Sequence, residues 1–294
     1  LSLNKVSRLF QDGFEVRVSP ATLAKARTQA SEGLQYATRE VYEEVRKAPF
    51  KNVDETKWTQ SGDRLVLWAI VTENASFFAI LPTRATIAAK SLLGCEETGV
   101  VTTDRYGAYN FLYPKQHAYC WSHLDRNFQR FAESPEPQKT FGERGMSIAD
   151  AIFHAWHLWL VGVLKVWEFD DQILTARQRL GKLLWWGINS SNPEIVRFSR
   201  DLNSRWESLF VFAKYRIDPT NNAAERALRP GVIWRKICMG TRSDGGDFFV
   251  GRILTATETC KKQNRSLIGV LNKVFESRGH GIINPPVSVM SKIQ

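Results

Sequence analysis

The sequence has few cysteines and no long uncharged apolar run. Its four cysteines, at positions 95, 120, 238 and 260, form no C-x-x-C pair, which argues against a disulfide framework and against a four-cysteine zinc site. The most apolar stretch, "AIFHAWHLWLVGVLKVW" (151–167), is slightly too short to cross a membrane and carries two histidines and a lysine. We therefore expect a buried helix there, and no membrane contact.

The first residues, "LSLNKVSRLFQDGFEV", lack the apolar segment of a signal peptide. Together with the scattered cysteines, this favours a reducing, cytoplasmic setting. The chain has 294 residues, of which 43% are hydrophobic, so it is long enough for a sizeable core and for more than one domain.

Acidic residues are in the minority. The chain has 40 Lys and Arg against 30 Asp and Glu, a net charge of +10, which favours a polyanionic partner. The segment from Pro219 to Arg265 contains nine basic and only four acidic residues, so half of the net charge falls in these 47 residues. This basic segment contains the motif "DPTNNAAERALRP" (218–230).

Residues 1–48 are expected to be helical. Ser19 followed by Pro20 is a helix start, with a capping serine and proline at the first helical position. A short helix over about 3–11, a glycine turn and this second helix would suit either a DNA-binding helix-turn-helix or a simple packing unit.

From residue 51 the hydrophobic period changes from helix to strand. Segments rich in Val, Ile, Phe and Trp, separated by turns at 61–63 and 73–74, predict a three-stranded antiparallel meander. A helix over 86–94 then leads to an apolar strand at 99–104, a fifth strand at 117–121 and another helix. This order is the ribonuclease-H-like arrangement, an α/β fold with a mixed five-stranded sheet and flanking helices.

The rest of the chain is expected to be mostly helical. A polar loop should precede helices at about 147–168, 170–188 and 193–215, whose tryptophans, including Trp167 and Trp185, would be core residues. "GVIWRKICMG" (231–240) would be a strand or loop, before helices at about 247–263 and 266–277. We expect five segments: an N-terminal helical region (1–48), a first core part (49–129), an all-helical insertion (130–217), a second core part (218–277) and a tail (278–294).

Glu225 has two interpretations. Asn222 and Glu225 have the spacing of a capping box, and Pro230 would limit that helix to about two turns. Alternatively, Glu225 is a metal ligand. Asp54, in the first strand, and Asp104, at the end of the fourth, would meet on central strands, where two carboxylates oppose joint ionisation unless a cation lies between them. Mg²⁺ suits such oxygen ligands, and a helix packed beside the first strand would let Glu225 supply a third.

Four blocks carry a resemblance to a known family. "VDET" (53–56), "VTTDRYGAY" (101–109), "CWSHLDRNF" (120–128) and "PTNNAAERALRPGVIWRKICMGTRSDGGDFFVGRILT" (219–255) resemble the signature blocks of the insertion-sequence-66 family of bacterial DDE transposases. The resemblance extends over about residues 3–277. It implies that Asp54, Asp104 and Glu225 are the metal-binding catalytic triad of a ribonuclease-H-like core. The implied activity is cleavage and joining of DNA ends with two Mg²⁺ or Mn²⁺ ions.

Other residues have supporting roles in this interpretation. Cys120 and His123 form a C-x-x-H that is expected to be structural beside the site, as are Asn221 and Asn222. Glu55 and Asp125 are interpreted as solvated or capping acids. Five basic residues are candidate contacts for DNA phosphates: Arg226, Arg229, Arg235, Lys236 and Arg242.

The expected partners are transposon ends and target DNA, in a homodimer or larger assembly, with small accessory proteins of the same element. The chain would work in the bacterial cytoplasm, at the nucleoid. Two alternatives remain open from the residues: a metal-dependent nuclease that only hydrolyses DNA, and a catalytically silent DNA-binding relic or fragment.

Overall fold

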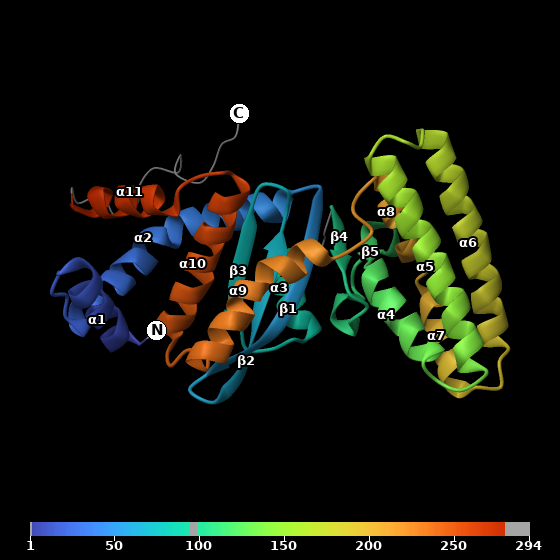
Figure 1. The fold of residues 1–294 in the computed structure, drawn as a ribbon, viewed down its shortest axis with the longest axis horizontal. Helices are drawn as coiled ribbons and strands as arrows, with labels where there is room; N and C mark the ends of the chain where they lie inside the picture. The colour runs from blue at the N-terminus through green and yellow to red at the C-terminus, as the bar shows by residue number, and fades with distance from the viewer. Residues whose placement is uncertain (1, 95–98, 280–294) are drawn as a thin grey trace. The chain divides into compact units, whose positions relative to one another are not determined.

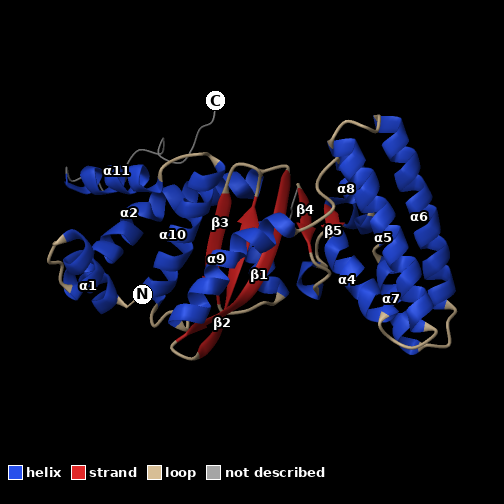
Figure 2. Ribbon diagram, in the orientation of Figure 1, coloured by secondary structure: helices blue, strands red, loops and turns tan. Residues whose placement is uncertain are grey.

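The computed structural model describes residues 2–94 and 99–279. It shows a mixed five-stranded sheet with flanking helices, a ribonuclease-H-like α/β fold, with strand order β3-β2-β1-β4-β5 (Figure 2). Cys95 and most of the expected tail at 278–294 lie outside the described residues. The strands are β1 (Phe50–Gln60), β2 (Asp63–Val71), β3 (Ser76–Leu81), β4 (Val100–Thr103) and β5 (His117–Tyr119).

The chain divides into two compact units. The first comprises residues 1–96 and 222–294, and the second residues 97–221. The first unit holds strands β1 to β3 and these helices: α1 (Leu3–Phe14), α2 (Pro20–Lys47), α3 (Thr86–Leu93), α9 (Asn222–Cys238), α10 (Asp244–Lys262) and α11 (Leu267–Gly279).

In the first unit, β1, β2 and β3 form the antiparallel meander that the sequence predicts. Ser61 and Gly62, which join β1 to β2, both have positive φ angles, of 50° and 98°. Such angles at both central residues belong to the hairpin turn whose twist matches that of the flanking strands. The turn fixes the register in which Asp54 pairs with Ala69, and therefore decides which side chains share a face.

The two faces of the meander are covered by different helices. Leu67, Ala69 and Val71 of β2 pack with Ala224 and Leu228 of α9 and with residues of α10. Helix α2 contacts β2 and β3 and passes behind the strands in the view of Figure 1. Ser19 caps α2 by accepting a hydrogen bond from the Thr22 N–H at 3.0 Å, so the start expected from the sequence is confirmed.

Strand β3 is an edge strand that α10 protects. The N–H groups of Ser76 and Phe78 donate to the hydroxyls of Thr259 and Thr255, at 3.2 and 3.0 Å. The helix can approach this closely because a Cβ at Gly251 would lie only 2.9 Å from the Phe78 carbonyl oxygen. Side-chain hydroxyls thus satisfy backbone donors that an edge strand otherwise leaves open.

Helix α9 is longer than the sequence suggested. It runs from Asn222 to Cys238 with Pro230 inside it, so the expected end after two turns and the expected strand or loop at 231–240 are both wrong. Proline removes one helical hydrogen bond, the one to the carbonyl of Arg226, a residue at the exposed surface. Tertiary packing offsets this loss, because Gly231 lies against Leu67 so closely that a Cβ there would overlap the leucine side chain.

In the second unit, β4 and β5 pair in parallel, with Thr102 opposite Ala118. All four residues of β4 are buried, as expected for a strand inside a covered sheet. Large apolar side chains of the helices form one core, including Phe128, Phe141 and Phe198. The helices are α4 (Trp121–Ala132), α5 (Gln138–Leu160), α6 (Val166–Ile188), α7 (Pro193–Ser204) and α8 (Val211–Tyr215).

Helix α5 begins nine residues earlier than the sequence suggested, at Gln138 instead of about 147. The two glycines that resembled loop residues are contact points between helices. A Cβ at Gly142 would overlap the backbone of Ala132, and one at Gly145 would overlap the ring of Phe128. The glycines therefore let α5 lie directly on α4.

Three further expectations for this unit are wrong. The stretch 151–167 is interrupted between α5 and α6, and the helix expected at 193–215 is broken by the short 3₁₀ helix Trp206–Leu209. Trp167 and Trp185 are not core residues, because they are 66% and 70% exposed. Helical spacing identified the amphipathic face, but these two side chains lie outside the stripe that packs inward.

Candidate active site

Asp54 lies in β1, on the face of the meander that α9 covers. It is directly opposite Ala69, and opposed residues of an antiparallel pair point to the same side of a sheet. Ala69 belongs to the cluster that packs with α9. The Asp54 carboxylate is half-buried, and its Oδ1 accepts a hydrogen bond from the Glu55 N–H at 2.9 Å.

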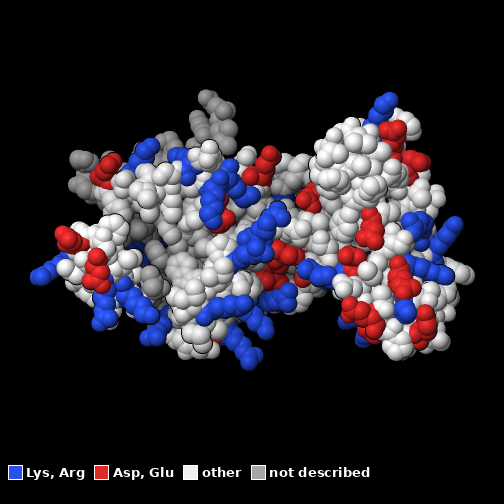
Figure 3. All heavy atoms as spheres, in the orientation of Figure 1, with Lys and Arg blue, Asp and Glu red and all other residues white. Residues whose placement is uncertain are grey.

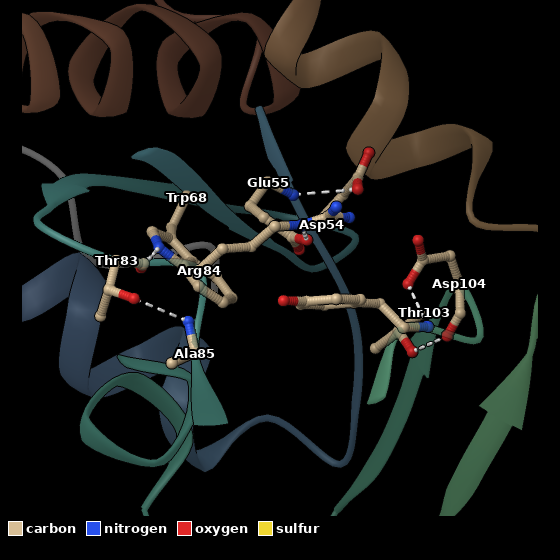
Figure 4. Close-up of polar contacts among 9 residues, drawn as sticks. Asp54, Glu55, Trp68, Thr83, Arg84, Ala85, Thr103 and Asp104 are labelled. Atoms are coloured by element: carbon tan, nitrogen blue, oxygen red, sulfur yellow. Dashed lines mark hydrogen bonds and ion pairs between the residues drawn. The ribbon is translucent and has the colours of Figure 1, made fainter. Parts of the chain in front are cut away.

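Glu55 points to the opposite face from Asp54. Its carboxylate is only 1% exposed and forms an ion pair with Arg84, as Figure 4 shows. Beside it, the indole N–H of Trp68 donates to the Thr83 carbonyl at 3.3 Å. The interpretation of Glu55 as a solvated or capping acid is wrong. Strict alternation along β1 would have indicated this, because neighbouring strand residues face opposite sides.

Glu225 lies in α9, which runs in the same direction as β1. Gly231 packs on Leu67, which pairs with Thr56, and further along the helix the Arg235 guanidinium donates to the Lys57 carbonyl. The rise is about 1.5 Å per helical residue and about 3.3 Å per strand residue, so the six residues from Gly231 back to Glu225 correspond to roughly three residues of β1. By this estimate Glu225 lies near the level of Asp54.

The helix start departs from the usual spacing of a capping box. Asn222 is the first helical residue, which puts Asn221 at the N-cap and Ala224 at the third helical position. The capping-box glutamate belongs at that third position, whereas Glu225 is the fourth. Glu225 is half-buried, beside the fully buried Ala224 that packs into the meander.

The segment that leads into α9 is anchored within the second unit. The Trp121 N–H donates to the Pro219 carbonyl at 2.9 Å, and the Asn221 N–H donates to the Cys120 Sγ at 3.1 Å. Cys120 and Asn221 are completely buried. Two of the sequence blocks, around Cys120 and around Asn221, are therefore joined by one backbone–backbone hydrogen bond and by one bond from a backbone N–H to the Cys120 thiol, which acts as the acceptor. His123 is half-buried in the first turn of α4.

Asp104 follows β4 in the second unit and is half-buried. Its Oδ1 accepts a hydrogen bond from the Tyr106 N–H at 2.9 Å, a local turn that orients the carboxylate. The Thr103 hydroxyl donates to the Asp104 carbonyl, as drawn in Figure 4, and lies 2.8 Å from Nε2 of His117. His117 is fully buried, and burial lowers its pKa from 6.5 to about 3, so its ring is neutral.

The loop after Asp104 is held by Arg105, which sequence reasoning missed. Its guanidinium forms an ion pair with Asp201 of α7, donates to Asn127 of α4 at 2.8 Å and lies 4.8 Å from the centroid of the Phe198 ring. Burial lowers the pKa of Arg105. The sequence feature that could have indicated a role for Arg105 is its position directly after a candidate catalytic aspartate.

Asp125 differs from the expectation of a solvated acid. It is half-buried in α4, and its Oδ1 is a buried atom without a hydrogen-bond partner among the described residues. Burial, and to a lesser extent the nearby Asp150, raise the pKa of this carboxyl.

Four of the five candidate phosphate contacts are exposed on the first unit: Arg226, Arg229, Lys236 and Arg242. The fifth, Arg235, is half-buried and bonded to the Lys57 carbonyl. Figure 3 shows Lys and Arg side chains over α9 and around its C-terminal end. The structure thus leaves four of the five free to meet a polyanion, while Arg235 also fixes α9 to β1.

The ribonuclease-H-like fold thus carries half-buried carboxylates in or directly after two strands and on the helix α9. In a comparison with known protein families, residues 1–247 match the model of the transposase IS66 family. The chain belongs to that family. No curated protein matches the chain significantly. Within the described residues, no helix combines the length and the apolar character needed to span a membrane.

Proposed function

We propose that this chain is a DNA transposase that cleaves the ends of an insertion sequence and joins them to target DNA. Its membership in the transposase IS66 family is the observation that carries the proposal. The shared face of Asp54 and Glu225 in the first unit supports it, because a helix cap would not need to lie beside that strand.

The proposed catalytic residues are Asp54, Asp104 and Glu225, which would hold two Mg²⁺ or Mn²⁺ ions. Their chemistry fits, because all three are carboxylates, the hard oxygen donors that these ions prefer. All three are also half-buried, so substrate can reach them. When bound, such ions activate a water or 3′-hydroxyl nucleophile and stabilise the leaving oxygen of an in-line displacement.

The chain's own residues supply position and charge. A strand fixes Asp54, the turn to Tyr106 orients Asp104, and the packing of α9 presents Glu225. Preorganised carboxylates avoid the cost of gathering like charges during the reaction. Exposed basic residues around α9 and its C-terminal end would bind the phosphodiester backbone, where charge contacts set register and orientation.

The wider setting is also part of the proposal. The partners would be transposon ends and target DNA, and a homodimer or larger assembly would hold two ends together. Small accessory proteins of the same element would take part, and the reaction would occur at the nucleoid in the bacterial cytoplasm. The basic balance of the chain, a net charge of +10, supports a nucleic acid as partner.

The test combines an assay on paired transposon ends, Mg²⁺ and a target plasmid with three variants: Asp54→Asn, Asp104→Asn and Glu225→Gln. Each removes one ligand charge while preserving shape. Strand cleavage should fall by more than the roughly 10- to 100-fold that loss of a residue supporting a metal ligand costs. Thermal unfolding and end binding should remain near those of the parent protein.

Asp63→Asn is the matched control, because Asp63 is an exposed carboxylate of the same meander. Full cleavage by any triad variant would remove that residue from the site. Cleavage of the ends without joining would identify a hydrolytic nuclease instead. End binding without cleavage in the parent protein would identify a catalytically silent relic.

A further inference from the structure

The first unit contains a second site candidate, away from the carboxylates. A cavity of about 840 Å³ lies between the start of α1, the second turn of α2, the C-terminal part of α9 and the start of α10. Figure 3 shows basic side chains on the surface in this region, between α1 and the adjoining ends of α9 and α10. Neither the proposed chemistry nor the family membership assigns a role to it.

The cavity wall is cationic. Lys5, Arg27 and Arg242 line it, and no acidic residue of the described parts of the chain does. None of the three forms an ion pair with a residue that the structure describes. The nearest acid to Arg242 along the chain, Asp244, accepts a hydrogen bond from the Gln60 side-chain amide at 2.9 Å. Asp244 and Asp247 both line a different cavity. Basic side chains that line one cavity without an ion-pair partner favour the binding of an anion.

Another part of the wall is aromatic and apolar. Trp234 and Phe249 both line the cavity and meet edge to face, with ring centroids 6.0 Å apart. The Arg27 guanidinium lies 5.9 Å from the Phe249 centroid. Ile237, another lining residue, is 67% exposed, so an apolar side chain stands in water at the cavity. A ligand that covers this wall must have a flat or apolar part as well as an anionic one.

We propose that this cavity binds a single nucleotide, with its phosphate among Lys5, Arg27 and Arg242 and its base against the wall formed by Trp234 and Phe249. The volume agrees, because pockets for ligands of this size measure about 300–1,000 Å³. A base in a duplex is stacked and paired and cannot enter such a cavity. Aromatic side chains beside a positive groove are the usual means of holding unpaired nucleotides.

The nucleotide has two possible sources with the same chemistry. It is either an unpaired nucleotide of a DNA strand or a free nucleoside monophosphate. Binding of a DNA strand rests on the proposed function, which brings DNA to the first unit. Binding of a free nucleoside monophosphate does not depend on that function. The proposal favours the DNA strand, because the exposed Arg229 and Lys236 on α9 continue the basic surface beyond the cavity.

The chain carries its own reporter for this site. Cys238 lines the cavity and is exposed, whereas Cys120 and Cys260 are buried. A bound nucleotide should slow the reaction of Cys238 with a maleimide, measured by intact mass, and Cys238→Ser gives the background labelling. The probes are a single-stranded oligothymidylate, a blunt duplex hairpin, thymidine monophosphate and inorganic phosphate.

The double variant Lys5→Gln with Arg27→Gln tests the cationic wall. For each charge-assisted hydrogen bond that it removes, protection by the oligothymidylate should weaken about tenfold or more. The salt dependence of protection should fall by roughly 1.4 in log–log slope, since each phosphate contact to a single strand contributes about 0.7. Arg8→Gln with Lys25→Gln is the matched control, with the same charge change on the same two helices but outside the cavity.

Each outcome of the protection experiment either supports or overturns the nucleotide site. Protection by the oligothymidylate that the first double variant loses and the second keeps supports the proposal, and additional protection by thymidine monophosphate would show that a free nucleotide suffices. Equal protection by the blunt hairpin, protection by inorganic phosphate alone, or no protection would each overturn it. End cleavage is measured separately, so a failure here leaves the proposed transposase activity standing, and the reverse also holds.

Discussion

Arg105 forms an ion pair with Asp201, a contact that ties the loop after β4 to helix α7. The same guanidinium reaches Asn127 of α4 and lies over Phe198 of α7, so two helices of the second unit hold the residue that follows Asp104. This arrangement makes Arg105 a positioning residue for the candidate catalytic aspartate.

Arg105→Gln should therefore lower strand cleavage more than it lowers end binding. Loss of the ion pair and of the stacking should also reduce the free energy of unfolding, by about 1–3 kcal/mol. The loss should not be larger, because the Asp201 carboxylate is 56% exposed and solvent screens its charge. Arg105→Lys keeps the charge but loses the planar fork, so it should restore stability more than cleavage. Cleavage assays and urea unfolding of both variants test this, and unchanged cleavage in Arg105→Gln would rule out the positioning role.

The exposed basic residues of α9 should bind DNA mainly through phosphates. Arg229→Gln with Lys236→Gln removes two of them without touching Arg235, whose bond to Lys57 is structural. The log–log slope of duplex affinity against salt should become shallower by roughly 1.8, since each phosphate contact contributes about 0.9. Arg197→Gln with Arg200→Gln, two exposed arginines of α7, is the matched control. An unchanged slope in the α9 variant would exclude this surface as the footprint.

Much of the fold could be predicted because local signals agreed with the tertiary structure. The strand pattern, the turn at Ser61 and Gly62, and the cap at Ser19 each specified one element. The placement of Asp54 on the face covered by α9 follows from the same alternation once the register is known. The expectation that this helix would lie against the first strand is confirmed.

The wrong predictions concern residues whose usual local preference was outweighed by tertiary packing. Gly142 suggested a loop but permits a close helix contact, and Pro230 suggested a helix end but lies inside α9. Neither contact is visible to a pattern that considers only neighbours in the sequence. Arg105 and His117 were missed for a related reason, because their partners are at least 14 residues away along the chain.

The protected edge of β3 gives a stability prediction with an internal control. Thr255→Val keeps the shape of a buried side chain but leaves the Phe78 N–H without its acceptor. The free energy of unfolding should fall by about 1–3 kcal/mol, the cost of one orphaned buried donor. Thr257→Val, two residues along α10, removes only a bond to the Ile253 carbonyl of the same helix. It should change stability by less than about 0.5 kcal/mol, and equal effects of both variants in urea unfolding would refute the edge role.

His117 should make the protein lose stability in acid. Its pKa is lowered from 6.5 to about 3 by burial, with a smaller contribution from Arg205. Between these values the unfolded chain takes up a proton that the folded chain refuses, so protonation favours unfolding as the pH falls. The histidine's stabilising contribution is complete above pH 6.5 and declines below it, by up to about 1.4 kcal/mol per pH unit.

The measurement is urea unfolding at pH 7, 6, 5 and 4 for the parent protein and for His117→Gln, which retains a polar partner for the Thr103 hydroxyl. The variant should be less stable at pH 7 because it fills the site imperfectly, but its stability should decline less steeply as the pH falls. Asp125 and Asp247 have pKa values raised by burial and act in the opposite direction. Both proteins contain them, so their effect cancels in the difference. Parallel pH profiles would show that His117 is protonated in the folded protein, and that its contact with Thr103 does not require a neutral ring.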